Sequence, residues 1–174
     1  MLKTAQFLRS DPLVELHDAD GSTVIQSVMA DQAFIVDTVM LTLRTQELDY
    51  HSGFNLVLGM GRNPEGELVS VDGESDPLES LIYVDTDGLD DHAPFKDELE
   101  SNLRLSKAVV GDFEAMTTLV TEKSTQLLRT STEPTPEREA GFFLRWLLAD
   151  NFVFMGAVHQ GMRHGLTDKA VKGL

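Results

Sequence analysis

The sequence predicts an α+β fold, a ferredoxin-like βαββαβ sandwich with an antiparallel sheet and extra helices. Three observations predict it: a strand that continues directly into a helix, two strands joined by a turn, and a further strand that leads into a long helical pattern. In chain order these segments are residues 23–30 and about 32–46, then 54–60 and 68–71, and finally 81–84 and 94–129. An apolar stretch at 152–155 would add the closing strand.

The first strand and its helix form the segment around which the other elements are organised. Val24 and Ile25 place apolar groups on both sides of the extended chain, which is typical of an interior strand. Asp31 stands at the position of a helix N-cap, where a short carboxylate accepts N–H groups of the first turn. The helix then carries an apolar stripe with the spacing i, i+4, i+8, formed by Ile35, Val39 and Leu43.

Two further strands are predicted from turn chemistry and from alternation. Residues 13–17 are extended and lead into the turn 18–21, where Gly21 can adopt a positive φ. This strand is therefore expected to form a hairpin with the strand at 23–30. Along 54–60, apolar residues alternate with other residues, which is the period of a half-buried strand.

The second half of the chain is predicted to be mostly helical and to contain an internal boundary. The pattern that begins at Pro94 has roughly a 3.6-residue period, which Gly111 could interrupt. We therefore predict an α+β module at 1–130 that includes this long helix, followed by a proline-rich linker at 131–136. Residues 137–174 would supply a helix and a strand that complete the module or open the next one.

The helix after the linker is predicted to dock through an apolar stripe. Pro136 suits the first helical position, and Asn151 ends the pattern before the apolar strand at 152–155. The stripe consists of Phe143, Leu144, Leu147 and Leu148. We expect Leu147 to pack into a core, so that its truncation to alanine would open a cavity.

Composition excludes several classes of function. The chain has 29 acidic and 14 basic residues and a formal net charge of -15. This field repels phosphate backbones and anionic membranes, so we expect no nucleic acid and no membrane as partner. The sequence contains no cysteine, which excludes disulfides and zinc–thiolate sites. Its apolar runs are shorter than a membrane span and it lacks a signal-peptide pattern, which predicts a cytoplasmic protein.

No set of titratable groups with the spacing of a catalytic or metal site is visible in the sequence. Asp85, Asp87 and Gly88 do not have the spacing of an EF-hand, and Gly59 and Gly61 lack the third glycine of a dinucleotide fingerprint. The lysines lie in polar, helical or terminal contexts, without the apolar site that would activate them. Three histidines are candidate metal ligands, and none has further ligands at metal-binding spacing: His17, His159 and His164. We expect no catalytic residue, cofactor or metal in this segment.

A series of motifs points to a known family. Residues 31–39, DQAFIVDTV, are similar to D-x-P-F-L-V-D-S-V, and residues 143–156, FLRWLLADNFVFMG, are similar to F-L-R-W-L-x-D-x-N-F-x-F-L-G. Between them the family's order is kept by NLVL, EGEL, ESLIYV and DFEAM, at 55–58, 65–68, 79–84 and 112–116. Over roughly residues 23–157, the chain resembles the amino-terminal region of the large bacterial NAD-specific glutamate dehydrogenases.

The resemblance implies a parent enzyme and a binding loop. Members of this family are far longer than 174 residues, so the chain would be an amino-terminal piece or a reduced relative. The parent reaction converts L-glutamate and NAD to 2-oxoglutarate, ammonia and NADH, with NAD bound downstream of the matched region. The family's amino-terminal region resembles ACT domains, whose loop between the first strand and the first helix binds an amino acid. The corresponding residues here are Ala30, Asp31, Gln32, Ala33 and Phe34.

Three functions remain open at this point. The first is a non-catalytic regulatory or assembly segment of the parent dehydrogenase, with the remaining domains of the parent as partners and a homo-oligomer as the expected state. The second is a stand-alone sensor, in which donors at the helix amino terminus bind the carboxylate of an amino-acid effector. The third is a structural oligomerisation domain whose exposed strand edges pair between subunits.

Overall fold

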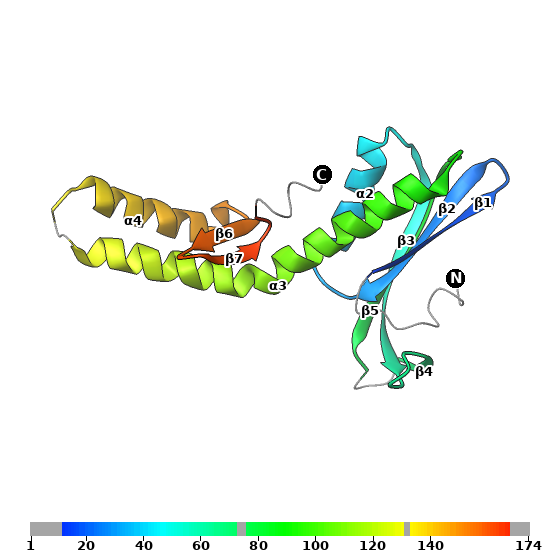
Figure 1. Ribbon diagram of the computed structural model, residues 1–174, viewed down its shortest axis with the longest axis horizontal. Helices are drawn as coiled ribbons and strands as arrows, with labels where there is room; N and C mark the ends of the chain where they lie inside the picture. The colour runs from blue at the N-terminus through cyan, green and yellow to red at the C-terminus, as the bar shows by residue number, and fades with distance from the viewer. Residues whose placement is uncertain (1–11, 73–75, 131–132, 168–174) are drawn as a thin grey trace. The chain divides into compact units, whose positions relative to one another are not determined.

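The computed structural model describes residues 12–72, 76–130 and 133–167, which form two compact units (Figure 1). The first unit ends at Ser106 and the second begins at Lys107, so the division falls inside one long helix. The boundary that the sequence places at 131–136 stays a prediction, and residues 131 and 132 lie outside the described residues. Each unit is described separately.

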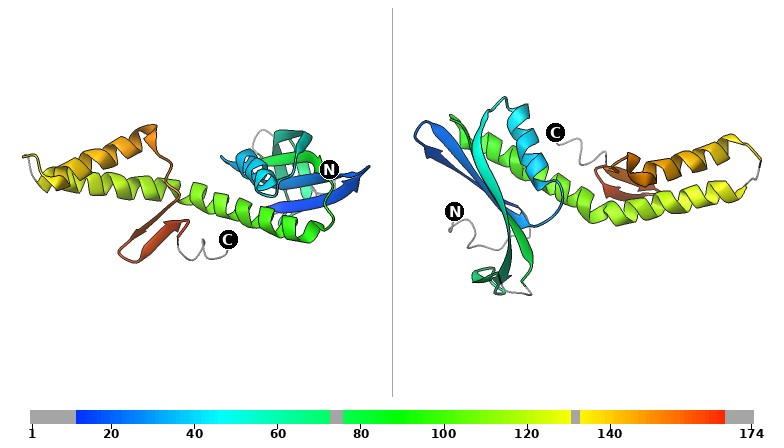
Figure 2. Two further views of the ribbon diagram at one scale, coloured as in Figure 1. Left: turned by 90° about the horizontal axis from the view of Figure 1, so that it is seen from above. Right: turned by 180° about the vertical axis from the view of Figure 1, so that it is seen from behind.

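The first unit contains a five-stranded antiparallel sheet with the strand order β1-β2-β5-β3-β4 (Figures 1 and 2). Two helices pack on one face of this sheet, namely α2 and the first part of α3. The bounds are β1 Leu13–Ala19, β2 Ser22–Ala30, α2 Ile35–Thr45, β3 Tyr50–Arg62, β4 Leu68–Val71, β5 Leu78–Asp87 and α3 His92–Thr130. The predicted antiparallel, ferredoxin-like α+β fold is confirmed.

The closing strand of the sheet comes from a different part of the chain than the sequence predicted. β1 pairs with β2 over seven residues, from Leu13 opposite Val28 to Ala19 opposite Ser22, and so takes the edge position beside β2. The predicted strand at 152–155 is not formed, and this prediction was wrong. β1 occupies that edge instead, because the tight turn after Ala19 pairs it directly with β2.

The core of the first unit lies between the sheet and the two helices. Ile25 of β2 lies opposite Val84 of β5, so both side chains are on the face that the helices cover. Residues from each element contribute, namely Val14, Ile25, Met29, Ile35, Val39, Leu43, Ile82, Val84, Phe95, Leu99 and Leu103. A smaller cluster of Val28, Met60 and Leu81 forms on the opposite face, because side chains alternate along each strand.

β3 is a strand as predicted, but its burial differs from the prediction. Residues 50–57 are exposed, and burial begins only near Gly59. Alternation predicted one covered face along the whole strand. In the structure, β3 pairs with β5 along one side, whereas β4 pairs only with residues 60–62 on the other. The first part of β3 is therefore an edge strand.

The second unit is a helical hairpin followed by a small β-hairpin. The later part of α3 is joined to α4 (Pro136–Trp146), then to a π-helical turn (Leu147–Asn151), β6 (Gly156–His159) and β7 (Met162–Gly165). Thr135 caps α4 through its side chain and Pro136 opens the helix, as predicted. α3 continues through Gly111, so the interruption expected there does not occur.

The predicted apolar stripe of α4 is covered only in part, and the closest contact with α3 is made by a residue outside it. Buried Gly141 lies against Leu128, and the buried hydroxyl of Ser124 donates to the Gly141 carbonyl at 2.8 Å. Of the predicted stripe, Phe143 is 56% exposed and Leu147 is only half-buried. The cavity expected on truncation of Leu147 stays a prediction, and the close helix contact itself is made by a glycine and a hydroxyl.

A first prediction follows from the lack of space at Gly141. An added Cβ would lie 2.8 Å from Cγ of Leu128, whereas a Cβ at Gly111 would have no neighbour within 4 Å. We expect Gly111→Ala to stabilise the chain by about 0.5–1 kcal/mol through helix propensity. Gly141→Ala should destabilise it, since overpacking costs about 1–3 kcal/mol and exceeds that gain. Denaturant unfolding of both variants tests this, and equal stabilisation at the two sites would contradict it.

A second prediction concerns the end of β5. Asp87 accepts the backbone N–H of Asp49 at 2.9 Å and lies 3.0 Å from Nε2 of His51. The backbone hydrogen bond, followed by the nearby His51, holds the pKa of Asp87 below its ordinary value of 3.8. A lowered pKa means that the ionised form stabilises the fold above pH 3.8 and that this contribution is lost as the pH falls through the lowered value.

Asp87→Asn should therefore be less stable than the wild-type chain at neutral pH, and the difference should shrink as the pH falls below 3.8. Urea unfolding across a pH series measures both curves. A difference that stays constant with pH would show that the carboxylate's charge does not stabilise this turn.

Candidate functional site

The loop at residues 30–34 connects β2 to α2 and is mostly exposed. The chain remains extended beyond Ala30, because the backbone N–H of Asp31 donates to the carbonyl of Leu78 at 2.9 Å. The helix begins only at Ile35, and its N-cap position is occupied by Phe34, which has a left-handed φ of 68° and provides no side-chain cap. The predicted N-cap role of Asp31 was wrong, since pairing with β5 carries the backbone past it.

The side-chain hydrogen bond at the first turn of α2 is made by Thr38, not by Asp31. Thr38 donates to the carbonyl of Phe34 through its backbone N–H at 3.0 Å and through its hydroxyl at 2.6 Å. Asp31 and Phe34 are exposed, and Gln32 is partly buried. The free N–H groups at the start of a helix favour a negatively charged group. The loop therefore presents an exposed carboxylate, Asp31, beside a helix amino terminus.

Gln32 carries the one feature of this loop that points to a ligand. Its Nε2 atom is buried and has no hydrogen-bond partner among the residues that the structure describes. A buried amide donor without a partner costs about 1–3 kcal/mol, which a ligand oxygen could recover. Sequence reasoning placed Gln32 in the loop, but the unpaired donor is visible only from the packing.

A buried ion pair lies at the same end of the sheet and was missed in the sequence. The guanidinium of Arg62 donates to both carboxylate oxygens of Glu79 at 2.6 Å, and the two side chains are 5% and 11% exposed. Glu79 lies opposite Ala30 in the strand register. The available signal was alternation, because Arg62 follows Met60 at i+2 on the buried face. Since the two charged groups pair with each other, we assign the ion pair a structural role: it links β3 to β5.

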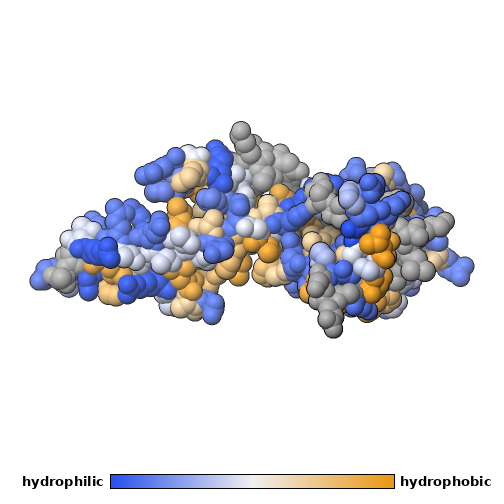
Figure 3. All heavy atoms as spheres, turned by 90° about the horizontal axis from the view of Figure 1, so that it is seen from below, coloured by the Kyte–Doolittle hydropathy of each residue, from blue (hydrophilic) through white to orange (hydrophobic). Residues whose placement is uncertain are grey.

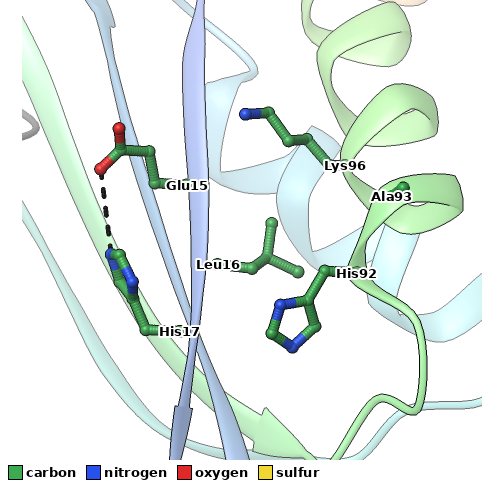
Figure 4. A pocket seen from close by; sticks show the side chains of 6 residues that line it. All are labelled: Glu15, Leu16, His17, His92, Ala93 and Lys96. Atoms are coloured by element: carbon green, nitrogen blue, oxygen red, sulfur yellow. Dashed lines mark ion pairs between the residues drawn. The ribbon is translucent and has the colours of Figure 1, made fainter.

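A hollow of about 410 Å³ lies between β1 and the start of α3 (Figure 4). Figure 4 shows that Glu15 and His17 point to one side of β1, whereas His92 and Lys96 lie on the other side. Nε2 of His17 is 3.8 Å from Glu15, and Nε2 of His92 is 3.0 Å from Asp18. These groups do not converge on one point. Within the described ranges, no group of three His, Asp or Glu residues could hold a metal ion.

The outer edge of β3 is the second candidate site. From Tyr50 to Leu58 this edge pairs with no other strand in the part of the chain that the structure describes. Four exposed apolar side chains line it, namely Tyr50, Phe54, Leu56 and Val57. Phe54 stacks on Tyr83 of β5, with ring centroids 5.3 Å apart and planes 3° from parallel.

This edge lacks the charged and proline residues that normally prevent strand pairing. Between residues 50 and 61 the sequence contains no lysine, arginine, aspartate, glutamate or proline. Edge strands that stay unpaired usually carry such residues. Gly53 allows close approach to β5, because a Cβ there would collide with the carbonyl oxygen of Tyr83. The strand is thus held firmly on one side and remains open on the other.

Among the described residues, no helix has both the length and the apolar character needed to cross a membrane. Residues 9–103 match the family model described as glutamate dehydrogenase, ACT1 domain. The NAD-specific glutamate dehydrogenase of Halomonas elongata is 34% identical over 146 residues, which cover 77% of this chain and 9% of that enzyme.

The NAD-specific glutamate dehydrogenase of Pseudomonas aeruginosa is 28% identical over 170 residues, which cover 87% of this chain and 10% of that enzyme. The chain thus spans about a tenth of the length of the curated relatives that it matches. The family model covers more than half of the chain and ends within the first unit. The motif-based assignment is confirmed: the chain belongs to the family of the glutamate dehydrogenase ACT1 domain.

Proposed function

We propose that this chain is a non-catalytic assembly and regulatory segment of an NAD-dependent glutamate dehydrogenase. The parent would convert L-glutamate and NAD to 2-oxoglutarate, ammonia and NADH, with NAD bound outside this segment. The family match and the small share of each relative that the chain covers support this proposal. The partners are the remaining domains of the parent and further copies of the subunit, and the proposed location is the cytoplasm.

The free edge of β3 carries the proposal of an assembly role. Two copies that pair antiparallel through this edge would satisfy the open backbone groups and bury the apolar side chains beside them. The absence of charged residues is important, because a chain with a net charge of -15 repels its copies over most of its surface. At this strand, apolar contact and backbone pairing meet no such local repulsion.

A third prediction tests assembly through β3. Leu56→Lys and Val57→Lys place a charge on opposite faces of the edge strand, and both side chains are already exposed, so the fold should persist. We expect wild-type chain to self-associate and each variant to do so at least about tenfold more weakly, as for a loss of roughly 1.4 kcal/mol. Leu41→Lys is the matched control, since Leu41 is also apolar and exposed but lies on α2.

Sedimentation equilibrium over a concentration series measures this association. A monomeric wild-type chain at high micromolar concentration would reject self-assembly through the edge. So would variants at 56 and 57 that associate as strongly as the control.

Amino-acid sensing at residues 30–34 is the second candidate function. The buried, unpaired Nε2 of Gln32 favours it, as a donor for the ligand carboxylate together with the amino terminus of α2. Asp31 no longer serves as a cap, so its exposed carboxylate is available to pair with the ammonium group of an amino acid. Ala30, Ala33 and Phe34 would form the remainder of this loop site.

A fourth prediction separates sensing from assembly. An amino acid at a hundred times its dissociation constant should stabilise the folded chain by about 2.7 kcal/mol and raise its melting temperature. Gln32→Met should retain or increase intrinsic stability, because it removes a buried unpaired donor, and it should abolish the ligand-induced shift. Asp31→Asn should also keep its stability and lose the shift. If no common amino acid at millimolar concentration shifts the wild-type melting temperature, the sensing function is rejected.

A further inference from the structure

α4 in the second unit is apolar on two opposite sides. Its inner side meets α3 through Gly141, whose carbonyl accepts the Ser124 hydroxyl, and through half-buried Leu144. At about 3.6 residues per turn, Phe142, Phe143 and Trp146 lie on the side away from Gly141. They are 44%, 56% and 52% exposed, and we call these three residues the aromatic face.

The aromatic face is internally ordered and continues into an apolar stretch. The rings of Phe143 and Trp146 stack with centroids 5.8 Å apart. Immediately after the π-helical turn, further large apolar residues are exposed, namely Phe152, Val153 and Met155. Figure 3 shows apolar residues gathered in the middle of this unit, whereas the end where α3 turns into α4 is mostly hydrophilic.

A helix on the outside of a finished unit carries polar residues on its outer side, and a helix that is apolar on both sides is normally covered on both. Large exposed apolar patches mark interaction sites. The second unit therefore has a completed contact between its own helices and an uncovered one on the opposite side of α4.

The matched ranges place the aromatic face within the family but outside the ACT1 module. The ACT1 family model ends at residue 103, within the first unit, so the aromatic face lies outside the ACT1 module. The alignment with the Pseudomonas aeruginosa enzyme covers 87% of the chain and therefore extends well into the second unit. About nine-tenths of that relative has no counterpart in this chain and is available to pack there.

We propose that the aromatic face docks onto the part of the parent polypeptide that lies outside these 174 residues. The second unit is then the first layer of the following domain, not an appendage of the ACT1 module. Phe143 and Trp146 are its anchors, because aromatic residues in a desolvated contact supply a large share of interface energy. This inference rests on the proposed function, since it requires a longer dehydrogenase subunit.

Hydroxyl-radical footprinting of the 174-residue chain and of the full-length parent tests the proposal. In the isolated chain, the only tryptophan, Trp146, and also Phe143 should be oxidised readily. In the parent, both residues should be oxidised at least roughly fivefold more slowly than in the isolated chain, as expected for residues at the centre of a contact that excludes water. Leu41, which is 57% exposed on α2, is the control and should change little.

Paired variants distinguish docking from a role in the core of the unit. Leu144→Ser on the inner side should lower the melting temperature of the isolated chain. The double variant Phe143→Ser and Trp146→Ser should leave this melting temperature unchanged within error. In the parent, docking should also protect Met155, which follows the aromatic face in the chain. The double variant should weaken docking there and make Met155 rapidly oxidised again. A drop with the double variant as large as with Leu144→Ser would show that the aromatic residues belong to the unit's own core and would overturn the proposal.

Two further outcomes would also overturn it. Oxidation of Trp146 that slows as the isolated chain is concentrated would show that a second copy covers the face. Equal oxidation in an active full-length dehydrogenase would reject docking and leave the proposed function intact. If the gene encodes no longer dehydrogenase, the proposed function itself fails, and this inference fails with it.

Discussion

The burial of β2 on both faces is the constraint on which the first unit depends. Every residue from Thr23 to Met29 is buried, and β2 is hydrogen-bonded to β1 on one side and to β5 on the other. Its Ile25 side packs against both helices, and its Val28 side packs against the smaller cluster under the β3–β4 hairpin. A strand buried in this way has no free register, because a shift by one residue would exchange its two apolar faces.

The pairing of β1 with β2 has consequences for the rest of the chain. It fills the edge that a later strand would occupy in the βαββαβ order, and the segment after α4 forms a separate two-stranded hairpin. That hairpin is held within the second unit by Asp112, which accepts the backbone N–H of Gly165 at 2.7 Å. At the opposite edge of the sheet, the outer side of β3 from Tyr50 to Leu58 pairs with no strand among the described residues, and this is the edge at which we propose assembly.

The two units bury their apolar residues in different ways. In the first unit, the large residues of β2, β5, α2 and α3 cover one another, and the buried Arg62–Glu79 pair ties the curled end of the sheet together. In the second, the close contact between helices is made by small groups, Gly141 and Ser124. The large aromatic residues of α4 are left outside. A glycine at the contact lets the helices approach closely, and it leaves bulkier residues to face the other way.

The sequence by itself determined the fold class, the interior strand β2, the β1–β2 turn and the start of α4, because these depend on local chemistry: apolar periodicity, a glycine with a positive φ, and a proline at N1. Its motifs also identified the family. Only the tertiary structure decided which strand closes the sheet, where α2 begins, and which side of α4 is buried. Each of these depends on contacts between segments that are distant in the sequence or on adjacent elements: β1 pairs along the edge of β2, the Leu78 carbonyl accepts the N–H of Asp31, and Leu128 lies against Gly141. Periodicity shows that a surface is apolar, but the partner that covers it is set by the rest of the molecule.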